Sequence, residues 1–153
     1  MSKKPVIDLQ KACLRAAQLV RERGLAKRTF ARYTGPERLA IGEQELACGQ
    51  QIALAAQGQY AVCALGGLAL AIHEQDPRLD HFPDIAAAAW SEVERLACTL
   101  SQELPSAEDS NLTDWGDNEC LAQLVALNDQ AGTTAEMVAQ RLERMAAAAP
   151  TCC

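Results

Sequence analysis

A chain of 153 residues with a formal net charge of −6 has the length of one domain and can bury a sizeable core. Hydrophobic residues make up 49% of it but aromatic residues only 4%, which favours close helix packing over a β-sandwich of aromatic and β-branched residues. No apolar run reaches the roughly 18 residues of a membrane span, and no apolar segment follows the N-terminal lysines as in a secretory signal. We therefore expect a cytoplasmic protein, in its own cell or in a host cell.

Apolar residues at helical spacing predict the first helix over residues 6–23. The positions that recur at steps of three and four are Leu9, Cys13, Ala16 and Val20. Gly24 follows as a stop signal, and a turn-rich connector comes next. A second helix is predicted over residues 36–57, although its interior glycines, at about 1 kcal/mol each relative to alanine, weaken that prediction.

The most apolar stretch, residues 59–74, predicts a central buried helix with a strand as the alternative, because its many alanines and glycines are poor strand formers. Three more helices are predicted, over residues 85–104, 121–127 and 134–149. The fold class is therefore all-α. We expect one domain over residues 1–149, a bundle of five or six helices around the Ala/Gly/Cys-rich central helix, with residues 150–153 as a flexible tail.

Charge is divided sharply along the chain. Residues 1–40 hold ten basic and three acidic residues, a net of +7, and residues 41–153 hold four basic and seventeen acidic residues, a net of −13. Two interpretations of the basic part stay open. It docks an acidic or phosphate-bearing partner, with Arg21, Arg28 and Arg32 among the contacts, or it lies against the acidic body and neutralises it. Double-stranded DNA is disfavoured because the acidic remainder repels phosphate.

The acidic part offers a second candidate for partner binding. Five carboxylates surround a tryptophan in one polar segment: Glu108, Asp109, Asp114, Asp117 and Glu119, around Trp115. Such a patch is suited to a basic groove on a larger protein, with the tryptophan as an anchor. The alternative is that the ring folds back and covers the edge of the core.

The candidate residues for chemistry form no recognisable catalytic or metal-binding set. Seven cysteines without a C-x-x-C pair are expected to be reduced thiols that pack as small hydrophobes, with a disulfide framework as the minor alternative. Cys63 lies in the most apolar stretch, which raises a thiol pKa, so core packing is favoured over nucleophilic catalysis. His73, Asp80 and His81 match no established ligand spacing. We therefore predict no enzyme, no cofactor and no metal.

The segment LNDQAGTTAEM, residues 127–137, looks like a small active site, but a helix boundary explains most of it. Thr133 and Glu136 have the spacing of a capping box, and Gly132 permits the turn before it. The Thr133 hydroxyl is then expected to contribute about 1 kcal/mol of stability. Asn128 and Asp129 keep a claim on function, because capping alone does not require both.

A ligand pocket would give Asn128 and Asp129 a functional role. It would lie between the helix that contains Cys63 and the turn at Asn128 and Asp129, with space left by Gly66 and the neighbouring alanines. Its occupant would be a small molecule or a nucleotide held by hydrogen bonds to the asparagine and the aspartate.

Three segments together resemble one family: LVRERGLAKRTFAR, YAVCALGGLALA and LNDQAGTTAEMVAQRL. In this order they are similar to small uncharacterised helical proteins of bacteria and phages, with a C-A-x-G-A helix and a closing (W)-N-D-x-x-G-x-T-x-x-E signature. The chain departs from that pattern at Leu127 and Thr133, where the family tends to have tryptophan and arginine. The resemblance implies a helical fold and a bacterial or phage setting, and it supplies no catalytic residues.

These observations predict a non-enzymatic protein that binds a macromolecular partner. The expected partner is another protein, bound by charge complementarity in the manner of an inhibitor or adaptor, and a homodimer stays open. Binding of a small molecule or nucleotide at the Cys63 and Asn128–Asp129 pocket is the second hypothesis.

Overall fold

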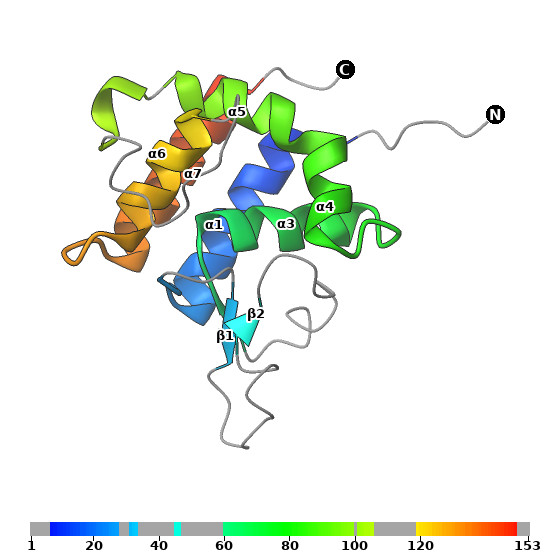
Figure 1. The fold of residues 1–153 in the computed structure, drawn as a ribbon, viewed down its shortest axis with the longest axis horizontal. Helices are drawn as coiled ribbons and strands as arrows, with labels where there is room; N and C mark the ends of the chain where they lie inside the picture. The colour runs from blue at the N-terminus through cyan, green and yellow to red at the C-terminus, as the bar shows by residue number, and fades with distance from the viewer. Residues whose placement is uncertain are drawn as a thin grey trace.

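Five helices make up most of what the computed structural model describes, which is residues 7–27, 31–33, 45–46, 60–99, 101–105 and 119–149 (Figure 1). In chain order they are α1 (Leu9–Arg23), α3 (Ala64–Gln75), a helix that runs from α4 (Phe82–Ile85) through the π-helix η2 (Ala86–Trp90) to α5 (Ser91–Cys98), α6 (Glu119–Asp129) and α7 (Ala135–Ala148). The predicted mostly helical single domain is confirmed. No helix in the described ranges is long and apolar enough to cross a membrane.

Helix α1 begins and ends where short-range signals place it. The Asp8 carboxylate accepts a hydrogen bond from the backbone N–H of Lys11 at 3.1 Å and caps the first turn. At the other end Gly24 has a φ of +91°, and its N–H donates to the Val20 carbonyl at 3.0 Å. A side chain is strained at that φ, so glycine is suited to end the helix. The prediction for residues 6–23 is confirmed over Leu9–Arg23.

Helix α3 is the buried centre of the fold, as predicted. All nine residues of Ala64–Ile72 are buried. Gly67 is where α1 and α3 approach closely, because a Cβ atom at this position would lie 3.4 Å from the Ala16 carbonyl oxygen. Helix α1 also packs along α7, so it lies between the central helix and the C-terminal helix (Figure 1). Small residues at these contacts let the helix axes come near one another.

A small antiparallel sheet corrects the prediction for the first half of the chain. Its strands are β1 (Ala31–Tyr33), β2 (Glu45–Leu46) and β3 (Tyr60–Val62), in the order β2-β1-β3. Ala31 in β1 lies opposite Leu46 on one side and Val62 on the other. The helix predicted over residues 36–57 is therefore wrong at Glu45–Leu46, and the rest of that range lies outside the described residues. The central helix starts at Ala64, because the residues before it form β3.

The second half follows the predicted order with shifted boundaries. The helix predicted over residues 85–104 starts earlier, at Phe82, and ends at Cys98, with a 3₁₀ turn, η3 (Ser101–Glu103), after it. The residues on its inner side are buried: Trp90, Val93, Leu96 and Ala97. In α7 three apolar residues at helical spacing have no exposed surface: Val138, Leu142 and Met145. These helices close the core around α1 and α3.

Candidate functional site

The three segments that carry the family resemblance meet at one junction beside the start of α3. Leu25, just after α1, forms a bridge with Val62 at the end of β3. The Ala26 N–H donates to the Val62 carbonyl at 3.0 Å, and the Val62 N–H donates to the Gly24 carbonyl at 3.2 Å. The end of α6 completes the junction through Asn128. Residues distant in sequence are therefore joined here by backbone and side-chain hydrogen bonds.

Asn128 is the polar centre of this junction and is only 1% exposed. Its Oδ1 accepts from the Ala64 N–H at 2.9 Å, in the first turn of α3. Its Nδ2 donates to the Ala26 carbonyl at 2.9 Å and to Asp129 Oδ1 at 3.0 Å. A buried amide without hydrogen-bond partners would cost folding free energy. Because the oxygen and the nitrogen of Asn128 each have their own partners, the side chain is held in one orientation. Asn128 fixes α6 to the start of α3 and to the segment that follows α1.

Cys63 caps α3 from the same junction. Its Sγ accepts from the Gly66 N–H at 3.1 Å. Burial raises the pKa of the Cys63 thiol to about 12, since desolvation outweighs the backbone hydrogen bonds that oppose it. This is the opposite of what an activated nucleophile needs. The four predicted ligand-binding residues, Cys63, Gly66, Asn128 and Asp129, do lie together, but their polar atoms bond to one another and to the backbone. Ligand binding there stays a prediction.

The predicted capping box at the start of α7 is wrong by one residue. Thr134 is the N-cap, and its hydroxyl accepts from the Met137 N–H at 3.2 Å. Thr133 is instead buried in the preceding turn, where its N–H donates to the Gln130 carbonyl at 3.1 Å. With the cap at 134, Glu136 is one residue short of the capping-box position. Its carboxylate receives an arginine from α1.

Arg21 joins α1 to two turns of α7. Its Nη2 lies 2.7 Å from Glu136 Oε1 and 2.8 Å from Glu143 Oε1. The guanidinium lowers the pKa of both carboxyls below their ordinary range. Arg15 likewise pairs with Glu74 of α3 at 2.9 Å. These two arginines of the basic helix therefore pair with carboxylates of other helices, as the neutralising interpretation expects.

Of the remaining predicted partner-binding residues, the structure describes two, Arg32 and Glu119. Arg32 donates from Nη2 to the Lys27 carbonyl at 3.2 Å, and Glu119 lies exposed in the first turn of α6. The others lie outside the described residues: Arg28, Glu108, Asp109, Asp114, Trp115 and Asp117. Partner binding by all of these residues stays a prediction.

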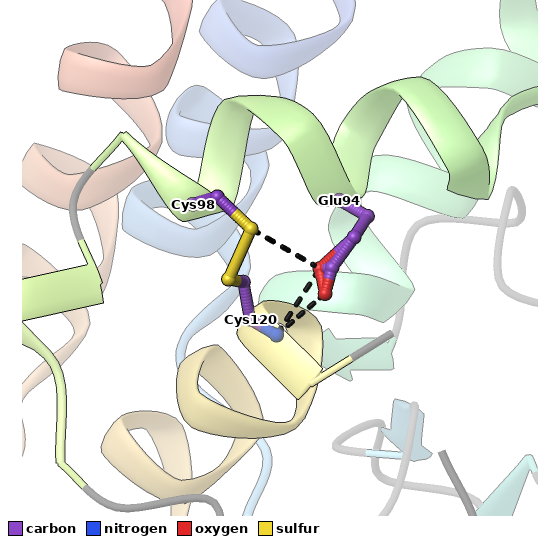
Figure 2. A group of neighbouring side chains, drawn as sticks. All are labelled: Glu94, Cys98 and Cys120. Atoms are coloured by element: carbon purple, nitrogen blue, oxygen red, sulfur yellow. Dashed lines mark hydrogen bonds between the residues drawn. A yellow bond between two sulfur atoms is a disulfide. The ribbon is translucent and has the colours of Figure 1, made fainter. Parts of the chain in front are cut away.

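Three side chains that the sequence interpretation did not connect form a thiol–carboxylate site, defined as Glu94, Cys98 and Cys120 (Figure 2). Cys98 at the end of α5 and Cys120 in the first turn of α6 are joined in a disulfide, with their Cα atoms 5.2 Å apart. The expectation that helical cysteines stay reduced is wrong for this pair. One signal was present in the sequence, since the four-residue spacing of Glu94 and Cys98 places them on one face of a helix.

Glu94 holds the start of α6 in place. Its carboxylate accepts hydrogen bonds from the Cys120 N–H at 2.5 and 3.1 Å and from the Leu121 N–H at 3.2 and 3.3 Å (Figure 2 draws those to Cys120). The first N–H groups of a helix have no partner within the helix, so Glu94 satisfies two of them from a neighbouring helix. Burial raises the pKa of Glu94, as does nearby Glu119, while the two N–H groups lower it. Glu94 as a whole residue is 8% exposed.

A family model covers nearly the whole described fold. The family of unknown function DUF6197 matches residues 7–148. The chain belongs to the DUF6197 family. Neither the search of curated proteins nor the search of solved structures found a match. The match to DUF6197 supplies no activity, so the interpretation of this member depends on its own side chains. Its range includes both the junction around Asn128 and the thiol–carboxylate site.

Proposed function

We propose that the protein acts by binding a basic macromolecular partner, as an inhibitor or adaptor, and not by catalysis. The observation that supports this most is the internal pairing of its arginines. Five described arginines, Arg15, Arg21, Arg78, Arg141 and Arg144, lie within 4.0 Å of a carboxylate of the same chain. Much of the positive charge is thereby neutralised within the fold, and the excess negative charge is left for a partner.

The excess is concentrated between α5 and α6. Residues 106–119 contain five acidic residues and no lysine or arginine. The described residue at the end of this acidic segment, Glu119, is exposed. Cys98 and Cys120 lie on the two sides of the segment with their Cα atoms 5.2 Å apart, so its flanks converge at one point on the helical scaffold. Anchoring of this kind lowers the entropy that is lost when a segment binds a partner.

The proposed mechanism is electrostatic steering followed by anchoring. Clustered carboxylates accelerate encounter with a basic surface and disfavour acidic partners. Trp115, in the middle of the acidic segment, is the proposed anchor, because a large aromatic ring contributes much of the energy when it is buried at an interface. The setting that we propose is the cytoplasm of a bacterium or of the host of a phage, as the resemblance implies.

Two observations give the competing functions less support. Cys13 and Cys63 are free and buried, and burial raises the pKa of each thiol to about 12, which disfavours nucleophilic catalysis by either. The pocket hypothesis relies on Asn128, whose Oδ1 and Nδ2 atoms already bond to Ala64, Ala26 and Asp129. A ligand at that amide would have to replace hydrogen bonds that hold three segments together.

The test compares two variants that lose the same charge. In the first, Asp109→Asn, Asp114→Asn and Asp117→Asn neutralise the acidic segment. The immobilised full-length protein captures proteins from bacterial extract, and each captured protein is purified and its Kd measured against wild type and variant. We expect a basic partner, a Kd at least tenfold higher for the variant, and weaker binding as salt rises.

The matched control removes three exposed carboxylates elsewhere through Glu22→Gln, Asp84→Asn and Glu92→Gln. Its Kd should stay within twofold of that of the wild type. The proposal is overturned if both variants weaken binding equally, since binding would then depend on net charge alone. It is also overturned if the purified partner is acidic or its affinity is insensitive to salt.

A further inference from the structure

The thiol–carboxylate site gathers three ligand atoms of two kinds from two helices. Glu94 and Cys98 lie one turn apart on α5, and Cys120 lies in the first turn of α6 (Figure 2). The carboxylate oxygen and the two sulfur atoms all lie within 4.8 Å of one another. Two atoms bound to one zinc ion are at most about 4.6 Å apart, because a Zn–S bond is about 2.3 Å long. Small side-chain rotations are therefore enough to place all three around one ion.

The chemistry of the three groups selects a class of metal. Two thiolates and one carboxylate suit a thiophilic divalent ion such as Zn²⁺ better than Mg²⁺ or Ca²⁺, which prefer oxygen ligands. When Cys98 and Cys120 are reduced and ionised, the three ligands together carry three negative charges, and the exposed Glu119 carboxylate adds a further repulsion on Glu94. A divalent cation at the centre would relieve this repulsion. Three protein ligands leave the fourth tetrahedral position open to water or to a group from a partner.

Glu94 is held as a ligand needs to be. The residue is buried, and its carboxylate is oriented by the N–H groups of Cys120 and Leu121. Two donors use only part of the acceptor capacity of a carboxylate, so lone pairs remain for an ion. Hydrogen bonds that orient a ligand are typical of the outer shell of metal sites. Cys98 is exposed, which gives an ion or a reductant access to the site.

Other cysteine, histidine and acidic side chains do not form such a set within the described residues. Cys13 and Cys63 are buried, and neither belongs to a cluster of three ligand atoms. His73 Nδ1 lies 2.9 Å from the Leu79 carbonyl oxygen and 3.9 Å from Asp80, which makes the ring part of a turn. The hollow on the outer face of α1, beside Leu14, offers no comparable convergence of groups.

We propose that Glu94, Cys98 and Cys120 form a zinc-binding site whose oxidised, metal-free form is the disulfide. A dithiol reductant converts the disulfide to two thiols and is itself oxidised to a disulfide, with two electrons and two protons transferred. The two thiols then bind one Zn²⁺ and release two protons, while Glu94 supplies the third ligand. The disulfide and the metal complex use the same sulfur atoms, so they exclude one another. The site does not depend on the proposed partner.

The test titrates the full-length protein with Co²⁺, which reports thiolate coordination through its charge-transfer absorption, and then with Zn²⁺, which displaces it. Protein reduced with a phosphine should bind one equivalent and show the thiolate band, and oxidised protein should show neither. Because this comparison needs no substitution, it does not depend on whether a variant folds. The proposal is overturned if reduced protein binds no Co²⁺, or if oxidised protein binds it equally.

Substitutions then assign the ligands. Cys98→Ser should weaken Zn²⁺ binding by more than about 100-fold, beyond the loss expected for an outer-shell group, and Glu94→Gln by at least about tenfold while the thiolate band remains. Glu92→Gln, an exposed neighbour on α5, is the matched control and should change the Kd less than twofold. Replacing the two C-terminal cysteines by serine should leave the band intact. Its loss in that variant, or its survival in Cys98→Ser, would place the metal elsewhere and overturn the proposal.

Discussion

Replacement of Asn128 by alanine should destabilise the protein strongly. The variant removes a buried amide that accepts from the Ala64 N–H and donates to the Ala26 carbonyl, both at 2.9 Å. Ala26 and Ala64 are each 1% exposed, so water cannot easily replace the lost partners. A buried donor or acceptor without a partner costs about 1–3 kcal/mol. Two such groups give an expected loss of about 2–6 kcal/mol from the free energy of unfolding.

The measurement is urea unfolding followed by far-UV circular dichroism. A domain of this size is stable by about 5–15 kcal/mol, so the variant should still fold with a clearly lower midpoint. Gln130→Ala, an exposed residue in the next turn, is the control and should change stability by less than about 0.5 kcal/mol.

A second variant separates the two hydrogen bonds. Asn128→Asp keeps the acceptor for Ala64 but, when ionised, cannot donate to the Ala26 carbonyl and lies beside the Asp129 carboxylate. Its loss of stability should therefore be larger at pH 7 than at pH 4, where a protonated Asp donates again. If Asn128→Ala unfolds at the wild-type urea concentration, the proposed structural role is refuted. If it also abolishes ligand binding, the pocket hypothesis replaces that role.

Breaking the disulfide with Cys98→Ser should lower the free energy of unfolding of the oxidised protein by about 3 kcal/mol, the entropic estimate for a separation of 22 residues; equal urea midpoints would contradict it. Thr134→Ala should cost about 1 kcal/mol through loss of the N-cap, and Thr134→Ser should restore most of it in thermal unfolding; an unaffected alanine variant would refute the assigned cap. Burial raises the pKa of Glu94 above its ordinary 4.5, so the folded state binds the Glu94 proton more tightly than the unfolded state does. This difference stabilises the fold below pH 4.5, and the stabilisation is lost as the pH rises through the folded pKa. The stability of wild type relative to Glu94→Gln should therefore fall from pH 4 to pH 8 in urea titrations, and a constant difference would contradict it.

Local sequence signals determined the helices that carry most of the core. Asp8 and Gly24 mark the two ends of α1, and both act within one helical turn of the backbone groups that they contact. The inward row of α7 consists of apolar residues at helical spacing, and it is buried. The scarcity of aromatic residues likewise indicated a helical fold. These features depend on propensities and spacing over a few residues, which a sequence displays directly.

The short strands could not be predicted in the same way. Strand β1 has three residues, and its Ala31 pairs with Leu46 and Val62, which are far away in sequence. Strands this short show no periodicity, and alanine is a poor strand former, so the tertiary pairing decides the conformation. The capping error at Thr133 has a related cause, since both neighbouring threonines are suitable caps and only the packing of the preceding turn selects Thr134.

The candidate sites were decided by tertiary structure. The spacing of Glu94 and Cys98 was readable on one helix, but only the packing of α6 against α5 brings Cys120 to them, across 22 residues of chain. The sequence indicated that Cys63 and Asn128 belong to one recognisable pattern. Only the fold determines that the asparagine joins α6 to α3 and to the segment that follows α1 through hydrogen bonds. A sequence specifies which groups are present and their local periodicity, whereas convergence of distant groups depends on how the buried helix faces pack together.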